Sequence, residues 1–304
     1  MLVTIIDGGN AFSQFTPGSY VPPDLTAPVF APYAQTYSTR ESYITPAEFV
    51  ASPTGVNIST LVPGGTAAAN ADALVQIIAR ASAWADTICE QVLTATKETT
   101  AGTYRVQSDG RILVPVAYSP IVSVHEVLLG ITAASRSPIG NLSAIEIDRK
   151  VVSIPALGLN GKASVSVTYV SGFANGSMMT NSDAGTSTIT LDNVLGIRPG
   201  MGLTVHDPGL TELVQVLSIM GNTLMLVSPL IAAHAVGINV SSLPASIKGA
   251  VIQLASSLIK NRSSQAVELS SMRGQPSTQV TGGSSGASEQ KIAREMLAPF
   301  RRII

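Results

Sequence analysis

The sequence is poor in charged residues. Only 12% of its 304 residues are Asp, Glu, Lys or Arg, whereas 45% are hydrophobic; soluble domains carry roughly 25% charged residues. A surface with so few charges is expected to be covered in part by other molecules. The formal net charge of −1 also excludes a strong overall field that would attract nucleic acid or acidic ligands.

Cysteine is almost absent. Cys89 is the single cysteine, which excludes an internal disulfide framework and fits a reducing compartment. The segment Met1–Asp7 has no basic residue, and its apolar run stops at Asp7, so we expect no secretory signal.

One long stretch lacks charge altogether. Val214–Val240 contains no Asp, Glu, Lys or Arg, but Gly221, Asn222 and Pro229 interrupt it. The breaks and the β-branched residues near its two ends predict a buried β-hairpin in place of a membrane span. We therefore expect no membrane partner.

The signatures of catalysis and metal binding are also missing. Gly282–Gly286 matches G-x-S-x-G, but no buried strand precedes it and no histidine follows, so we interpret it as a loop. Glu146 and Asp148 lie two apart on a predicted strand, where a solvated face is expected. The histidines are scattered and lack the spacing of metal ligands: His125, His206 and His234. We expect no enzyme activity, no cofactor and no metal.

Basic residues are concentrated near the C-terminus. From Pro244 onward there are 8 Lys and Arg against 3 Asp and Glu, so the remainder has 10 against 16. Two interpretations stay open. The basic residues form ordinary solvated helix faces, or they form an element that meets an acidic partner or DNA.

Residues 1–65 are rich in proline, glycine, serine and threonine and show no convincing periodicity. Because proline removes backbone donors and favours extended chain, this region is predicted to be an extended arm. Aromatic side chains along it are expected to dock into grooves on a neighbouring molecule: Phe12, Phe15, Tyr20, Phe30, Tyr33, Tyr37, Tyr43 and Phe49.

Three helices and a stretch of strands follow. Apolar residues spaced by fours and threes predict a helix over residues 66–96, capped by Thr66 or Asn70. Residues 102–170 switch to a period of two, and Ser108–Gly110 is a hairpin turn signal. A second helix is predicted over residues 244–262, with Pro244 in its first turn. A short helix, Ser288–Leu297, and a tail complete the chain.

Residues 174–242 are predicted to be an inserted all-β unit. Short strands are expected around glycine-containing turns: Thr188–Leu191, Gly202–His206, Glu212–Ile219 and Thr223–Val227. The predicted fold class is α+β. Three helices pack against a β layer from residues 102–170, with the inserted β unit and the N-terminal arm outside this core.

The order of these elements and three local strings resemble the phage head–tail connector (adaptor) family. The first string is Leu113-Val-Pro-Val-Ala-Tyr-Ser-Pro-Ile-Val-Ser-Val124, after the first helix and a hairpin. The second is the helix Leu243–Arg262, and the third is the closing Ile292-Ala-Arg-Glu-Met-Leu-Ala-Pro-Phe-Arg-Arg302. The resemblance covers residues 66–173 and 243–304, a little over half of the chain.

The resemblance implies a structural virion protein, located at the head–tail interface and assembled in the host cytoplasm. It implies a ring of copies, commonly twelve, beneath the portal, with a channel for DNA and a C-terminal segment that reaches the portal. The arm and the β insertion lie outside the family core, and we expect them to contact neighbours, capsid, or tail and stopper proteins. A stopper or a fused decoration protein is a further virion role that they leave open.

For the tail, a loose chain end is one interpretation. In the other, the arginines meet carboxylates or phosphate, including non-specific DNA contact, while the apolar side chains fill a portal groove. The residues predicted to bind the portal are Lys291, Arg294, Pro299, Phe300, Arg301, Arg302, Ile303 and Ile304. The rival hypothesis from another class is a β-rich binding module, an adhesin, decoration or carbohydrate-binding protein. Against sugar stacking, residues 174–242 contain no Trp, Tyr or Phe; a hydrolase is third.

Overall fold

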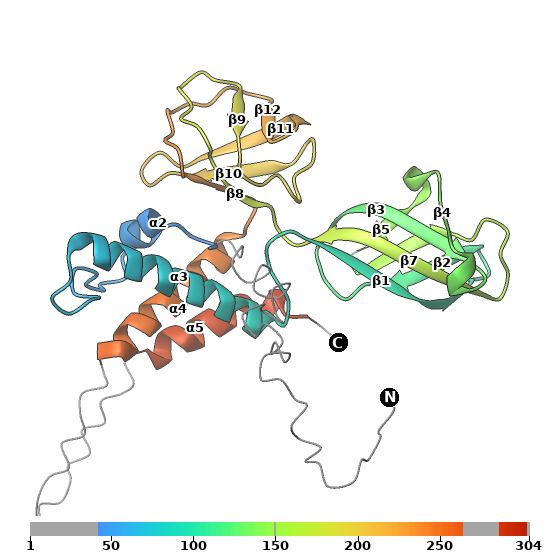
Figure 1. Cartoon of the computed structure of the whole chain (residues 1–304), viewed down its shortest axis with the longest axis horizontal. Helices are drawn as coiled ribbons and strands as arrows, with labels where there is room; N and C mark the ends of the chain where they lie inside the picture. The colour runs from blue at the N-terminus through green and yellow to red at the C-terminus, as the bar shows by residue number, and fades with distance from the viewer. Residues whose placement is uncertain (1–41, 149, 264–285, 303–304) are drawn as a thin grey trace, which may run out of the picture. The chain divides into compact units, whose positions relative to one another are not determined.

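The computed structural model describes residues 42–148, 150–263 and 286–302. Its fold class is α+β, as predicted: the described residues form a group of helices and three antiparallel sheets (Figure 1). These elements surround three apolar cores: one belongs to the helices, one is shared by two of the sheets, and one belongs to the third sheet.

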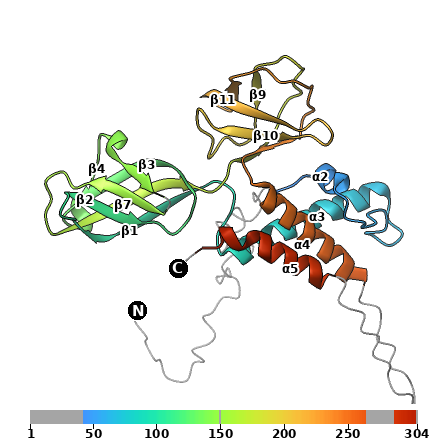
Figure 2. The same ribbon diagram turned by 180° about the vertical axis from the view of Figure 1, so that it is seen from behind.

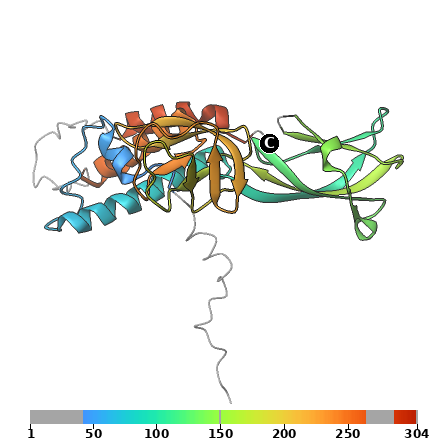
Figure 3. The same ribbon diagram turned by 90° about the horizontal axis from the view of Figure 1, so that it is seen from above.

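The long helices form one bundle. α3 (Ala67–Cys89) and α5 (Ala287–Leu297) both pack against α4 (Ala245–Ser263), and the view from above shows α3 and α5 on opposite sides (Figure 3). The side chain of Thr66 accepts a hydrogen bond from the backbone N–H of Ala69, which confirms the predicted cap. α3 ends earlier than predicted because Glu90 adopts a left-handed conformation with φ of 56°.

Part of the predicted arm belongs to this bundle. α2 (Pro46–Ala51) begins with a capping box, in which Thr45 and Glu48 each bond the other's backbone N–H. Tyr43 and Phe49 are buried in the core of the bundle instead of being free to dock on a neighbour. The prediction of an extended arm is therefore wrong at Pro46–Ala51, where Pro46 occupies the first turn of a helix.

Residues 1–41 are not described. The predicted arm contacts Phe12, Phe15, Tyr20, Phe30 and Tyr33 all lie outside the described residues.

Two sheets between residues 96 and 171 share one core (Figure 2). The first has the order β1 (Thr96–Arg105), β7 (Lys162–Ser171), β3 (Ile121–Gly130) and β4 (Ser137–Pro138). The second has the order β2 (Arg111–Pro115), β6 (Val151–Pro155) and β5 (Glu146–Asp148). Short 3₁₀ helices lie at Ala133–Ser135 and Leu142–Ala144.

The turn predicted at Ser108–Gly110 is present, because Gln107 donates its backbone N–H to the carbonyl of Arg111 over 2.8 Å. The strands that it joins nevertheless separate into different sheets. Alternate residues of β2 are buried, and they belong to the same apolar core as buried residues of β7; Val114 and Val167 are examples. The prediction that the helices pack on this β layer is therefore wrong, since the sheets cover each other and the helices form a separate core.

The third sheet matches the predicted insertion. Its strand order is β8 (Asn175–Ser177), β13 (Asn239–Ser241), β10 (Gly202–His206), β11 (Glu212–Met220), β12 (Thr223–Leu226) and β9 (Thr188–Thr190). The chain after β8 pairs with that after β9 through an antiparallel bridge between Met178 and Leu191. The sheet thus closes on itself around its own core, and we refer to it as the closed β unit.

The predicted hairpin within Val214–Val240 is confirmed as β11 and β12, joined at Gly221. It is not fully buried, because Leu213 is 76% exposed and Met220 is 75% exposed on the outward side. None of the helices in the described ranges combines the length and the apolar character needed to cross a membrane.

Candidate functional site

The C-terminal tail lies against the end of α3. A 3₁₀ helix, Ala298–Phe300, follows α5 directly. Gln91 donates its side-chain amide to the carbonyl of Phe300 over 2.7 Å, and Arg302 donates its backbone N–H to the carbonyl of Cys89 over 2.8 Å. The tail as far as Arg302 is therefore held by backbone hydrogen bonds.

Phe300 packs into this chain and does not project from it. Its ring meets the ring of Phe173 edge to face, with centroids 6.0 Å apart, and both rings pack against the helical core. Phe173 directly follows β7, so its contact with Phe300 joins two segments that are far apart in the sequence. Phe300 is thus a structural contact within the chain, whatever else the tail binds.

The two arginines of the tail also have partners in the chain. Arg301 lies 3.3 Å from a carboxylate oxygen of Glu90, with 56% of its side chain exposed. The guanidinium carbon of Arg302 lies 5.1 Å from the centroid of the Tyr118 ring, within the range of a cation–π contact. Tyr118 is in the string Leu113–Val124 that resembles the adaptor family, so the first and third strings meet here.

Lys291 and Arg294 are exposed on α5, one turn apart. The structure thus places both side chains toward solvent. Ile303 and Ile304 lie outside the described residues.

A buried polar cluster lies near the C-terminal end of α3. The hydroxyl of Tyr43 bonds the carboxylate of Asp86, which also accepts the backbone N–H of Leu93 over 3.1 Å. Burial, followed by the charge of Asp86, raises the pKa of Tyr43 well above its usual value. The same two causes raise the pKa of the buried Cys89 thiol to about 12, so this cysteine is not an activated nucleophile.

A second buried cluster joins α2, α4 and the closed β unit. Lys248 lies 2.6 Å from a carboxylate oxygen of Glu48 and donates to the side-chain oxygen of Asn239 over 2.7 Å. Burial lowers the pKa of Lys248 to about 8, although Glu48 opposes this effect. Burial and then the charge of Lys248 lower the pKa of His206, 3.7 Å from Glu48, to about 3. His206 is therefore neutral at physiological pH.

A third cluster surrounds His234. Its ring nitrogens lie 2.9 Å from Asp207 and 2.6 Å from Glu212, and its side chain has no exposed surface. Both nitrogens are occupied by carboxylates, so His234 cannot activate a nucleophile in the manner of a catalytic triad. His234 is buried, and it forms an antiparallel β-bridge with Ser182.

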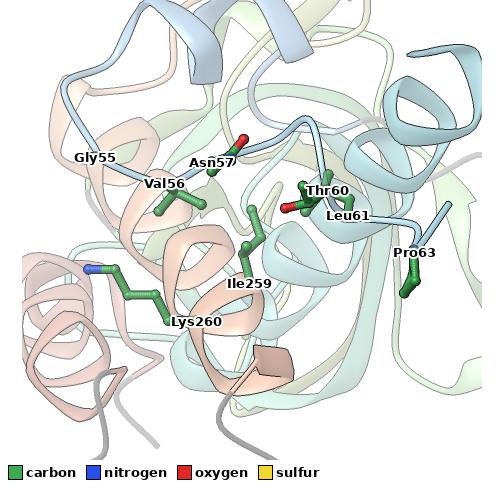
Figure 4. Close-up of a pocket in the computed structure, with 8 residues that line it drawn as sticks. All are labelled: Gly55, Val56, Asn57, Thr60, Leu61, Pro63, Ile259 and Lys260. Carbon is green, nitrogen blue, oxygen red and sulfur yellow. The ribbon is translucent and has the colours of Figure 1, made fainter. Parts of the chain in front are cut away.

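The cavities offer no better chemistry. One of about 440 Å³ lies between the loop before α3 and the end of α4 (Figure 4). Its polar side chains include Asn57 and Lys260, and Lys260 forms an ion pair with Glu289. Among the described residues, no group of three or more His, Cys, Asp or Glu is placed to hold a metal ion.

The sequence identified the basic and aromatic tail residues but missed what they contact. Glu90, Gln91 and Tyr118 have no motif that would mark them as partners of a segment some 200 positions away. The sequence contained weak indications that Glu48 and Lys248 have structural roles. Glu48 completes a capping box after Thr45, and Lys248 follows directly on Ile247 in the apolar stripe of α4.

No family model matches the sequence, and no curated protein matches it. Among solved structures, a chain from the neck of an empty GTA particle, computed with C6 symmetry, is similar to this chain with a TM-score of 0.34 and 14% sequence identity. The similarity covers 86% of this chain and 94% of that chain. A TM-score of 0.34 does not establish a common fold.

Proposed function

We propose that this protein is a structural virion protein, a head–tail adaptor that forms a ring beneath the portal and joins the capsid vertex to the tail. It acts by assembly and catalyses no reaction. Copies of the chain, the portal, and tail or stopper proteins are its partners. DNA passes through the channel of the ring and makes only non-specific contact with the protein.

One observation carries the proposal. The three segments that resemble the adaptor family are far apart in the sequence, and the closing segment contacts both of the others. α5 packs against α4, and Arg302 contacts Tyr118 of the first string. These contacts support the view that the three segments belong to one structural unit.

The surface of the chain supports assembly. Large apolar side chains remain exposed on the closed β unit, among them Ile231, which is 84% exposed, and Leu213, which is 76% exposed. Side chains of this kind gain free energy when a partner removes them from water. The low content of charged residues in the whole sequence also supports assembly.

The tail is prepared for binding by its contacts within the chain. Because Gln91 and Cys89 hold its backbone, Arg301 and Arg302 are presented in a fixed geometry, and little conformational entropy is lost when a partner binds. Lys291 and Arg294 add exposed charge along α5. We propose that these four residues form the basic part of the portal contact.

The test is the mass of the purified protein, measured alone and with portal protein. We expect a closed multi-copy ring and a stable complex with the portal. Reversal of charge at Lys291→Glu and Arg294→Glu is expected to weaken portal binding at least tenfold and to leave the ring intact. The matched control is Lys97→Glu with Arg105→Glu, which makes the same change of charge at two exposed positions of β1.

A chain that stays monomeric at all concentrations and does not bind the portal would overturn the proposal. Equal loss of portal binding in the control variant would instead remove Lys291 and Arg294 from the contact and attribute the effect to net charge alone.

A further inference from the structure

The buried cluster around Lys248 brings together three groups that can react with one another. The ammonium nitrogen of Lys248 lies 2.6 Å from Oε1 of Glu48 and donates to Oδ1 of Asn239 over 2.7 Å. An amine is a nucleophile once it has lost a proton, a carboxylate can take and return that proton, and a carboxamide carbon can be attacked. The amine is therefore placed against the carbonyl that it would attack, with a proton acceptor beside it.

Three different elements hold these groups in place. Glu48 is in the first turn of α2, where its other carboxylate oxygen accepts the backbone N–H of Thr45 over 2.7 Å. Lys248 is in the first turn of α4, and Asn239 is the first residue of β13. Because the fold already brings the groups into contact, a reaction between them is unimolecular and pays no cost for bringing them together.

The amide of Asn239 is held in one orientation. Its nitrogen donates to Oδ1 of Asn175 over 2.8 Å and to the carbonyl of Gly176 over 3.2 Å. Both N–H groups of the amide are thus used on the side away from Lys248, which leaves the carbonyl oxygen facing the amine. The carbonyl carbon lies one bond beyond that oxygen. A hydrogen bond to the oxygen draws electrons from this carbon and makes it easier to attack.

Burial favours attack by the amine over attack by water. Asn239 is 3% exposed and Lys248 is 6% exposed. The same burial lowers the pKa of Lys248 to about 8, so the neutral, nucleophilic amine is present near that pH. His206 lies 3.7 Å from Glu48 and is neutral, so it does not compete with Lys248 for the charge of the carboxylate.

We propose that Lys248 and Asn239 form an amide bond with each other inside the folded chain, with Glu48 as the acid–base group. Glu48 takes a proton from the ammonium group, and the lysine nitrogen attacks the side-chain carbonyl carbon of Asn239. The new C–N bond forms, and the bond from that carbon to Nδ2 breaks. The two protons lost by the lysine nitrogen pass to the departing nitrogen, which leaves as ammonium, and Glu48 is again a carboxylate. No oxidant, reductant or other reactant is needed.

The bond fixes β13 to the first turn of α4. Residues 240–247 then lie inside a closed loop, so tension along this connection between the closed β unit and the bundle bypasses them. The ion pair of Lys248 and Glu48 is the state of the chain before the reaction, and the coupling of these two groups in unfolding is a property of that state. The inference concerns a single chain and does not rest on the proposed ring.

The experiment follows the intact mass of the purified full-length protein from soon after synthesis through several days at pH 8. We expect the mass to fall by that of one ammonia, about 17 Da. We also expect trypsin to stop cutting the denatured protein after Lys248, because a lysine whose amine is acylated is no longer recognised. Fragmentation of the resulting peptide should find Asn239 and Lys248 joined.

Variants test the role of each group. Lys248→Arg keeps the positive charge beside Glu48 but has no nucleophilic amine, and Asn239→Ala has no carbonyl to attack; both should keep their full mass. Glu48→Gln should slow the loss of ammonia by about 100-fold or more. The matched control is Lys260→Met, which removes another lysine of α4 that is paired with a glutamate and should react as the wild type does. Circular dichroism of every variant separates loss of chemistry from loss of fold.

A second route to the same mass change has to be distinguished. Asn160 and Asn175 each precede a glycine, and such an asparagine can lose ammonia by cyclising onto the backbone. That product hydrolyses in mild alkali and leaves Lys248 open to trypsin, whereas the proposed bond does neither.

Wild-type protein that keeps its full mass would overturn the inference and show that the cluster is an ion pair and nothing more. Loss of ammonia with cleavage after Lys248 intact would also overturn it. A Glu48→Gln protein that is folded and reacts at the wild-type rate would remove Glu48 from the mechanism. None of these results bears on the ring or on portal binding.

Discussion

The Nε2 atom of His234 lies 2.6 Å from Oε1 of Glu212, in a site where the imidazole has no exposed surface. The other ring nitrogen lies 2.9 Å from Asp207. Each ring nitrogen faces a carboxylate oxygen, and a neutral imidazole can donate a hydrogen bond to only one of them, so the protonated ring satisfies both contacts. The closed β unit therefore holds a buried cation between two anions.

The first prediction concerns pH. Burial alone lowers the pKa of His234, but its bonds to Asp207 and Glu212 outweigh burial and raise the pKa above the usual value of 6.5. A raised pKa in the folded state means that the stabilisation is fully present below pH 6.5 and is lost as the pH rises through the folded-state value. His234→Asn should thus cost about 3 kcal/mol of unfolding free energy near pH 5.5 and distinctly less at pH 9.

Thermal unfolding of the wild type and the variant across this range measures the difference. His125→Asn is the control, because His125 is exposed on β3. A difference that grows with pH would contradict the protonated ring.

The second prediction concerns the pair Lys248 and Glu48. Both side chains are largely buried, so removing one leaves the other as an uncompensated charge. Lys248→Met or Glu48→Gln alone should each lower the free energy of unfolding by about 3 kcal/mol, and the double variant should recover much of that loss. Urea unfolding of the four proteins gives the coupling energy, and additive losses would mean that the two groups do not interact.

The third prediction concerns the thiol of Cys89. The side chain is buried, and its pKa is raised to about 12, so at pH 8 almost no thiolate is present and none is accessible. Native protein should react with a thiol reagent only as fast as the helical bundle opens, at least 100-fold more slowly than unfolded protein. Rapid reaction of the native protein would show that the tail does not cover the end of α3.

The helices could be predicted from sequence because each signal is local. Each signal involves residues only a few positions apart: the apolar periodicity of α3, the cap at Thr66, and the change of composition near residue 263. Proline misled the prediction at Pro46. The same residue favours an extended chain or the first turn of a helix, and only the capping box of Thr45 and Glu48 decides between them.

The packing could not be predicted in the same way. Period-two segments predicted strands between residues 102 and 170, but the pairing of β1 with β7 and of β2 with β6 depends on contacts 36 or more positions apart. The buried clusters around Lys248 and His234 could not be predicted for the same reason. The sequence near these two residues does not indicate that Glu48, Asp207 or Glu212 would be their partners, since only the fold brings these side chains together.

The last prediction tests the junction that supports the tail. Gly172 has φ of +100°, and a Cβ atom there would lie 2.4 Å from the carbonyl oxygen of Thr94. Gly158 also has positive φ, but nothing lies within 4 Å of its Cβ position. Gly158→Ala should therefore cost only the backbone strain of about 1 kcal/mol, whereas Gly172→Ala should cost roughly 3 kcal/mol because backbone must move.

The movement has a further consequence. Phe173 donates its backbone N–H to Leu93 and packs against Phe300, so a shift at Gly172 loosens the tail. Trypsin should then cleave after Arg301 and Arg302 several times faster in Gly172→Ala than in Gly158→Ala. Equal cleavage rates, together with equal stabilities, would mean that Phe173 does not hold the tail in place.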